Sequence, residues 1–333
     1  MLSSIISLIL VVVISACSIS LTPVFADGLF EEKLSAAFGD RKANLVIKMM
    51  PPVVTTETLM NKTQKPVIEF MLSDSNTNKS FSHVTYFITI EKEGKRLLSD
   101  WFHDDAGNLR IQMKPSNLSQ VVVYGEQDPI LNAYSGTSES PVIAAGPIFL
   151  EGGLCHFIVR IVTVDYDRTM LPDDKQPVFD GYLSVGNVEN YGAVIAGKET
   201  PIKIISYYDK LRNITFDSKE SELSFTMPFN CNLSRIQNVN IFVHEEISIP
   251  KSSNFTSPSY MGIINGVDMS KQLYLDNSNP REDIIHFMLP KDKLVSLAEQ
   301  MKYDSTSSTG LMKFILKPST QAGTNVTSMT AMS

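Results

Sequence analysis

The stretch VTYFITIEKEGKRLLSDWFH, residues 84–103, is typical of a β-hairpin and indicates the fold class of the chain. Apolar and polar side chains alternate on both arms, and the Glu93-Gly94 pair between them is typical of a two-residue turn. A two-residue loop fixes the register of such a hairpin. Three cross-strand pairs then share one mostly apolar face, namely Ile90 with Leu97, Tyr86 with Trp101, and Val84 with His103.

The same period of two recurs along most of the chain, in short segments separated by turns, which is typical of β-sandwiches. The stretch EGGLCHF, residues 151–157, has the frame of the corner that enters strand F of immunoglobulin-like domains, with Cys155 in the place of the tyrosine. Residues 291–302 have a helical period instead. The sequence therefore predicts an all-β fold of two immunoglobulin-like β-sandwich domains with one short C-terminal helix.

Residues 165–177, DYDRTMLPDDKQP, are polar and contain two prolines, as linkers between domains often do. We therefore expect a first sandwich over residues 27–165, a linker over 166–177 and a second sandwich over 178–318. The end of the chain, residues 319–333, is rich in serine and threonine and predicts a disordered tail.

The first 26 residues carry no charged side chain and include an apolar run over 5–16. Val24-Phe25-Ala26 supplies the small residues of a signal-peptidase site, so we expect a signal peptide cleaved after Ala26. Two alternatives remain: residues 5–25 could be retained as a membrane anchor, and Cys17 could carry a lipid. All three predict an extracytoplasmic chain, secreted or attached to the cell surface.

The net charge of −7 and the pI near 5.3 argue against nucleic acid as a partner, because phosphate binding requires clustered basic side chains. Seven N-x-[ST] sequons fit an exported, glycosylated protein. The candidate glycosylation sites are Asn61, Asn78, Asn117, Asn213, Asn232, Asn254 and Asn325.

Three stretches in the second half are NITFDSKESELSFTMPF, NVNIFVHEEISIPKS and YMGIINGVD. They resemble a module that recurs in secreted and surface proteins of archaea. In the first half, VTYFITIEKEGKRLLSDWFHDDAGNLRIQMKP and GPIFLEGGLCHFIVRI are similar to large exported proteins of ammonia-oxidising archaea. The resemblance covers most of residues 30–318 and implies a compartment and a β-fold, but it implies no activity.

Beyond the predicted cleavage site the chain has two cysteines, Cys155 and Cys231. Strand alternation points both side chains inward. An oxidising compartment favours a disulfide between them, whereas two separate buried thiols would behave as small apolar side chains. Both alternatives remain open.

Copper is the first metal to consider, because histidine and methionine ligands are present. A blue-copper site requires a cysteine, a histidine and a methionine close together. Cys155 and His156 are adjacent, but the next methionine is Met170, which excludes that pattern.

A looser metal site could combine His83, His103, His156, His244 and His286, and the candidates taken from this set are His83, His103 and His244. In the hairpin register above, His83 and His103 fall on opposite faces, so they cannot bind one metal together, and a shift of one residue would bring them opposite each other. His244-Glu245-Glu246 lacks the second histidine of an H-E-x-x-H motif, so a solvated strand edge is the favoured interpretation.

The chain has no nucleophile elbow and no glycine-rich phosphate loop after a strand, and no catalytic or cofactor-binding residue is assigned. We predict a secreted or cell-surface binding or structural protein of the archaeal envelope, with a cell-envelope protein or a glycan as partner. One alternative is a metal-binding protein, or an accessory protein of a membrane-bound oxidase, with copper as cofactor. The other is a secreted hydrolase.

Overall fold

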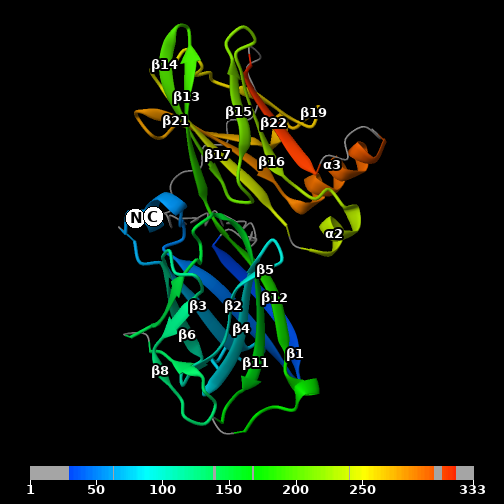
Figure 1. Ribbon diagram of the computed structural model, residues 1–333. Helices are drawn as coiled ribbons and strands as arrows, with labels where there is room; N and C mark the ends of the chain where they lie inside the picture. Colours follow the sequence, from blue (N-terminus) through cyan, green and yellow to red (C-terminus); the bar gives the residue numbers. More distant parts are fainter. Residues whose placement is uncertain are drawn as a thin grey trace, which may run out of the picture.

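The computed structural model describes residues 30–62, 64–137, 140–166, 169–239, 241–303 and 310–319. It consists of two β-sandwiches arranged end to end, the second above the first in Figure 1. The predicted all-β fold of two sandwiches is confirmed. The predicted signal peptide with its cleavage site at Ala26, the lipidation site at Cys17, residues 320–333 of the tail and the sequon at Asn325 lie outside the described residues.

The first sandwich consists of two six-stranded sheets. One has the order β1 (Glu31–Phe38), β2 (Arg41–Met50), β3 (Val67–Asp74), β6 (Asn108–Pro115), β10 (Val142–Gly146) and β7 (Val122–Tyr124). The other has the order β12 (Val178–Val185), β11 (Gly153–Thr163), β4 (Val84–Lys92), β5 (Lys95–Asp104), β9 (Tyr134–Ser135) and β8 (Glu126–Gln127). A short helix, α1 (Thr56–Met60), precedes β3, and a 3-10 turn, η1 (Asp173–Lys175), precedes β12.

The second sandwich consists of two five-stranded sheets. One has the order β13 (Asn187–Ile195), β14 (Lys198–Ser206), β17 (Val243–Pro250), β21 (Glu282–Leu289) and β20 (Leu273–Asp276). The other has the order β15 (Arg212–Asp217), β16 (Glu222–Pro228), β22 (Leu311–Pro318), β18 (Tyr260–Ile264) and β19 (Val267–Asp268). Helix α2 (Leu233–Asn238), helix α3 (Lys291–Tyr303) and the 3-10 turn η2 (Ser270–Gln272) complete this half.

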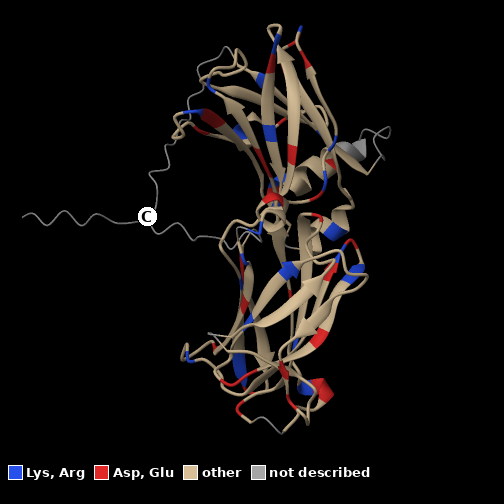
Figure 2. Cartoon of the chain, turned by 60° about the vertical axis from the view of Figure 1, so that its left-hand side comes forward, with Lys and Arg blue, Asp and Glu red and all other residues tan. Residues whose placement is uncertain are grey.

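Each sandwich has its own hydrophobic core, because the inward faces of its two sheets bury their apolar side chains against each other. The predicted C-terminal helix is confirmed as α3, and it buries Leu294, Leu297 and Ala298 in the second core. Within the described ranges, none of the helices combines the length and the apolar character that crossing a membrane requires. Basic and acidic residues are interspersed along the strands and loops of both sandwiches (Figure 2).

The expected boundary between the sandwiches needs correction. Strand β12 was expected to open the second sandwich, but it pairs with β11 over eight residues and buries Phe179, Leu183 and Val185 in the first core. The polar segment before it connects two neighbouring strands of one sheet, and Leu171 N–H donates to Val162 C=O at 2.8 Å. The chain crosses to the second sandwich at Gly186, between β12 and β13.

The register predicted for the hairpin is also wrong. Next to the turn, Lys92 pairs with Lys95, as expected, but Leu97 is an extra residue that no partner opposes. Beyond this bulge every pair is shifted by one residue, so that Ile90 faces Leu98 and Tyr86 faces Phe102. The shift buries Leu98 and Phe102, whereas Leu97 and Trp101 remain partly exposed.

This register predicts which aromatic side chain of β5 stabilises the first sandwich. Phe102 is fully buried, so Phe102→Ala should lower the free energy of unfolding by about 3–5 kcal/mol. Trp101 lies on the outer face, so Trp101→Ala should lower the free energy of unfolding by less than half that amount. Urea unfolding of both variants measures the two costs, and a larger cost at Trp101 would contradict the shifted register.

Candidate metal centre

Four of the five histidines gather into two groups, each with one carboxylate, and the ligand atoms of each group lie within 4.8 Å of one another. The rim cluster comprises His83, His103 and Asp105. The sheet cluster comprises His244, Glu246 and His286. The fifth histidine, His156, lies outside both groups, and its Nε2 is 2.9 Å from Asp180 Oδ1.

The pairing of β17 with β21 builds the sheet cluster. On β17, Val243, Glu245 and Ile247 point into the core, so that His244 and Glu246 share the opposite, outward face. On β21, Ile285 and Phe287 point into the core and His286 between them points outward. Because Glu246 is directly opposite His286 in the register, the three side chains meet on the outer face of the sheet.

The spacing of the ligand atoms fits a transition metal ion. His244 Nε2 lies 3.0 Å from His286 Nδ1, and each of these nitrogens lies 3.8 Å from Glu246 Oε1. The point equidistant from the corners of a triangle with these three sides lies about 2.1 Å from each corner. Zinc binds imidazole nitrogens and carboxylate oxygens at about 2.0–2.2 Å.

Aromatic rings surround the sheet cluster. The ring of Tyr207 stacks on His244 with a centroid separation of 5.0 Å, Phe242 lies 6.1 Å from His244, and Tyr274 on β20 lies 5.8 Å from His286. The hydroxyl of Tyr207 donates to Glu246 Oε1 at 3.2 Å, which orients one predicted ligand atom. His244 is buried, whereas Glu246 and His286 are partly exposed, which leaves access for a fourth ligand from solvent.

Burial determines the protonation of the two imidazoles. It lowers the pKa of His244 to about 3, with the neighbouring His286 adding to the effect, and it also lowers the pKa of His286. Burial raises the pKa of Glu246, against the hydrogen bond from Tyr207. Both imidazoles are therefore neutral at physiological pH, which is the form in which histidine binds a metal.

This ligand set suits some metals and not others. Two imidazoles and a carboxylate, with one position open, form a ligand set found in zinc sites, and copper(II) binds nitrogen and oxygen ligands more tightly still. Calcium requires six to eight oxygen ligands and does not fit two imidazoles. The ligand set of the sheet cluster is therefore compatible with zinc or copper(II).

Glu245 lies on the other side of the same strand and is fully buried in the second core. Ser206 Oγ donates to its Oε1 at 3.0 Å, while its Oε2 has no hydrogen-bond partner among the described residues. Burial raises the pKa of Glu245 well above its ordinary value of 4.5. Burial therefore favours the protonated, neutral form of this carboxyl in the folded protein, beneath the sheet cluster.

A protonated Glu245 predicts a pH dependence of stability. Above pH 4.5 the unfolded chain releases this proton and the folded chain retains it, so the free energy of unfolding falls as the pH rises, by up to about 1.4 kcal/mol per pH unit. Glu245→Gln removes this contribution while preserving the shape of the side chain. The difference in unfolding free energy between the metal-free variant and wild type should grow from pH 5 to pH 7 in urea titrations, and parallel profiles would contradict a protonated Glu245.

The structure separates the three candidate ligands that the sequence indicated. His244 lies in the sheet cluster, on an outer face but buried rather than solvated. From the sequence, His244-Glu245-Glu246 is interpreted as a solvated strand edge, and His286 is not singled out as the partner that completes the site. The sequence shows that His244 and Glu246 alternate along one strand. It does not show which strand pairs with that one.

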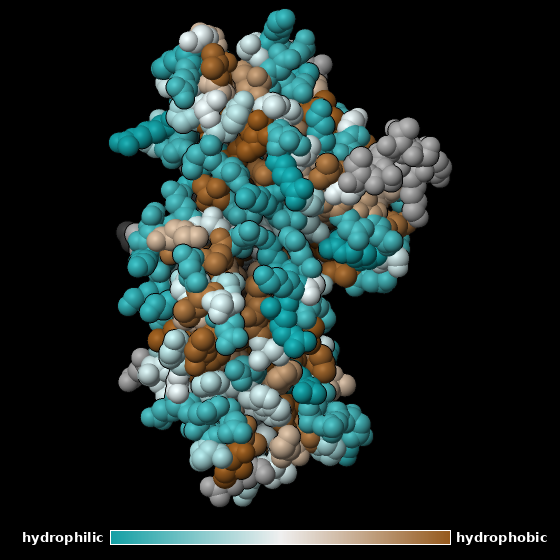
Figure 3. All heavy atoms as spheres, in the orientation of Figure 1, coloured by the Kyte–Doolittle hydropathy of each residue, from teal (hydrophilic) through white to brown (hydrophobic). Residues whose placement is uncertain are grey.

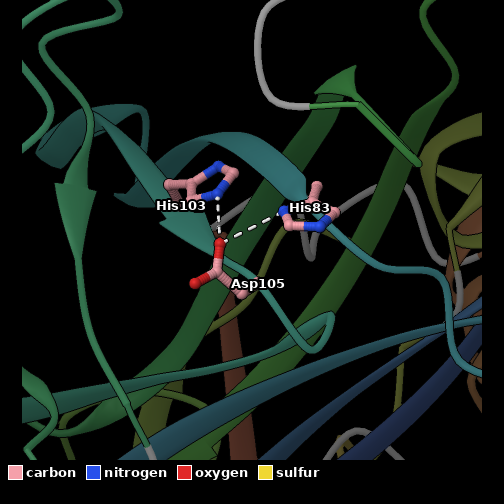
Figure 4. Close-up of side chains that lie close together, drawn as sticks. All are labelled: His83, His103 and Asp105. Atoms are coloured by element: carbon pink, nitrogen blue, oxygen red, sulfur yellow. Dashed lines mark hydrogen bonds and ion pairs between the residues drawn. The ribbon is translucent and has the colours of Figure 1, made fainter.

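His83 and His103 come together in the rim cluster, which corrects the expectation that they occupy opposite faces (Figure 4). The extra residue at Leu97 is the physical reason, because it shifts β5 by one residue relative to β4. The shift runs in the direction opposite to the one that the sequence left open, so that His103 faces Thr85 rather than His83. Asp105, in the turn after β5, is the third member that sequence analysis missed.

The two cysteines are free thiols in the structure, as in the second of the two alternatives. Cys155 is buried in the first core, and burial raises its pKa to about 12. Cys231 is partly buried just before α2, and burial raises its pKa as well. Neither thiol is activated as a nucleophile, since reactive cysteines have lowered pKa values.

A cleft of about 760 Å³ lies between the two sandwiches. Figure 3 shows the molecule hollowed beside the part of the second sandwich that carries α2. Lys92, Glu93 and Tyr182 of the first sandwich contribute to its walls, together with Tyr208 and Arg235 of the second. Arg235 Nη2 donates to the Tyr208 hydroxyl at 2.9 Å, which ties the two second-sandwich residues together.

The described sequon asparagines are all exposed, as glycan attachment requires. They are Asn61, Asn78, Asn117, Asn213, Asn232 and Asn254. The side chain of Asn232 also accepts a hydrogen bond from the Arg235 N–H and caps α2. Glycosylation stays a prediction.

Comparison of the chain with models of protein families, with curated proteins and with solved structures gives no match in any of the three.

Proposed function

We propose that this protein is an extracytoplasmic metal-binding protein that holds one zinc or copper(II) ion at His244, Glu246 and His286. One observation carries the proposal, namely three ligand atoms whose separations of 3.0, 3.8 and 3.8 Å match the bond lengths of a bound transition metal. The ligands come from two paired strands of a rigid sheet, so the site is formed before the ion arrives.

The electrostatics of the sheet cluster support the same proposal. Two neutral imidazoles require no deprotonation at physiological pH, and Glu246 supplies the negative charge that a divalent cation requires. The surrounding aromatic rings lower the polarity around the cluster, which strengthens the attraction between the carboxylate and the ion. The hydroxyl of Tyr207 keeps the carboxylate oxygen oriented towards the two nitrogens.

The proposed compartment rests on the N-terminal sequence and on the sequons. An uncharged apolar segment followed by Val24-Phe25-Ala26 is typical of exported proteins, and six sequon asparagines are exposed. In this compartment the protein would capture metal ions at the surface of the cell. Of the functions that the sequence left open, metal binding is favoured over a purely structural role or a hydrolase, because it alone has a specific arrangement of side chains behind it.

Zinc binding tests the proposal. An ion that binds only the folded state raises the free energy of unfolding, by about 2.7 kcal/mol when its concentration is 100 times its dissociation constant. We expect zinc to raise the unfolding temperature of metal-free wild type and to bind tightly in calorimetric titrations. His286→Gln should weaken binding at this site at least 100-fold, because it replaces one of three ligands with a poor one.

His156→Gln is the matched control. This substitution also removes an imidazole that lies beside a carboxylate on a β-strand, here β11. His156 belongs to neither of the two metal-ligand groups. Zinc binding and thermal stabilisation should be the same as in wild type. If His286→Gln retained all zinc sites of the wild type, the proposed site at the sheet cluster would be wrong.

A further inference from the structure

The rim cluster lies at the end of the first sandwich remote from the cleft. Strand β4 begins at Val84, next to His83, and ends at Lys92, which lines the cleft. The eight steps of β-strand from Val84 to Lys92 separate these ends by about 27 Å. The rim cluster is therefore distinct from both the cleft and the second sandwich.

Three backbone segments bring its side chains together (Figure 4). His83 precedes β4, His103 lies near the end of β5, and Asp105 lies in the turn between β5 and β6. His103 Nε2 is 3.1 Å and His83 Nδ1 is 3.3 Å from the same oxygen, Asp105 Oδ1. Two imidazole nitrogens thus converge on one carboxylate oxygen.

Buried hydroxyl groups orient the ring of His103. Its Nδ1 lies 2.9 Å from Thr85 Oγ1, which in turn lies 2.7 Å from Thr163 Oγ1, and both threonines are fully buried. Thr163 Oγ1 also lies 3.1 Å from the carbonyl oxygen of His83. A metal-binding histidine usually has such a partner at its second ring nitrogen, which fixes the tautomer and the direction of the ring.

The hydroxyls of Thr85 and Thr163 can hydrogen-bond with His103 Nδ1 both in the absence and in the presence of a bound ion. Without an ion, Thr163 donates to Thr85, Thr85 donates to Nδ1, and Nε2–H donates to Asp105. With an ion on Nε2, the order reverses: Nδ1–H donates to Thr85, Thr85 to Thr163, and Thr163 to the carbonyl of His83. Only hydroxyl rotations and a change of tautomer are needed, because a hydroxyl can donate or accept.

The backbone of His83 adopts a left-handed conformation with φ of +50°, as several other non-glycine residues of the described chain do. Two hydrogen bonds hold it there: its N–H donates to the Asp105 carbonyl at 2.9 Å, and its own carbonyl accepts from Thr163. Strained backbone of this kind persists where the surroundings impose it, and it occurs often at binding sites. Here it directs the imidazole towards Asp105 (Figure 4).

The rim cluster is open to solvent on one side. The side chain of His103 is 10% exposed, that of His83 41% and that of Asp105 80%. An ion held by these three would have its remaining positions accessible to water or to a ligand of another molecule. Its exchange with solution should be fast relative to the more enclosed sheet cluster.

We propose that the rim cluster is a second transition-metal site, which binds zinc or copper(II) through His103 Nε2, His83 Nδ1 and Asp105 Oδ1 and exchanges the ion with solution. Thr85 acts as a positioning residue for His103. The site is independent of the sheet cluster, because no residue is shared and the two lie in different sandwiches.

Zinc stoichiometry in the purified full chain tests this proposal, with inorganic zinc as the probe in equilibrium dialysis. Wild type should bind two ions, His286→Gln one, and His286→Gln combined with Asp105→Asn none at the same free zinc concentration. Asp105 is exposed, so its substitution should leave the fold intact, and circular dichroism checks this. Asp105→Asn alone should weaken the rim site at least 10-fold.

Copper(II) and a positioning variant give a second readout. In His286→Gln, the electron paramagnetic resonance spectrum of bound copper(II) should show coupling to two imidazole nitrogens. Thr85→Val should weaken binding there about 10-fold without removing any ligand. His156→Gln should change neither result.

The outcomes separate the two sites. If wild type binds one ion and loses it with His286→Gln, the rim cluster is only a pair of hydrogen bonds to Asp105 and this proposal is overturned, while the proposed function stands. If wild type binds one ion, keeps it with His286→Gln and loses it with Asp105→Asn, the rim site stands and the sheet cluster fails.

Discussion

The backbone hydrogen bonds between β17 and β21 hold eight residue pairs in one register, and the proposed metal centre depends on that register. The core requires Val243, Glu245 and Ile247 on the inner face, so that His244 and Glu246 must lie on the outer face. A slip by one residue would bury the outward side chains in the core. Packing of the second core therefore fixes the ligand geometry, although the ligands themselves do not belong to the core.

Desolvation is the second determinant of the site. Transferring a charged imidazole into an apolar surrounding costs several kcal/mol, so the protein keeps His244 and His286 neutral instead. Tyr207 contributes its ring to this shielding and its hydroxyl to the carboxylate of Glu246. Because a neutral nitrogen is what a transition metal requires, the burial that disfavours protonation of the two imidazoles leaves their nitrogens available to a cation.

Local sequence patterns predicted the fold class. The strand registers, the domain boundary and the partners of His244 depend on pairing between distant segments, which the sequence does not show. Alternation identified the strands around residues 84–103 and the helix that became α3, because both signals are contained in a short stretch. The bulge at Leu97 could not be predicted from the sequence. It determines whether Trp101 or Phe102 is buried, and that choice depends on packing against the opposing sheet. For the same reason His286 could not be assigned to His244, some forty residues earlier, and β12 could not be assigned to the first sandwich.

Diffraction from crystals of the zinc-loaded protein, recorded at the zinc absorption edge, tests the central claim most directly. The account predicts an anomalous peak on the outer face of β17 and β21, about 2.1 Å from His244 Nε2, His286 Nδ1 and Glu246 Oε1. A crystal that contains bound zinc elsewhere, with His244 and His286 still in direct hydrogen-bond contact and no peak between them, would contradict it.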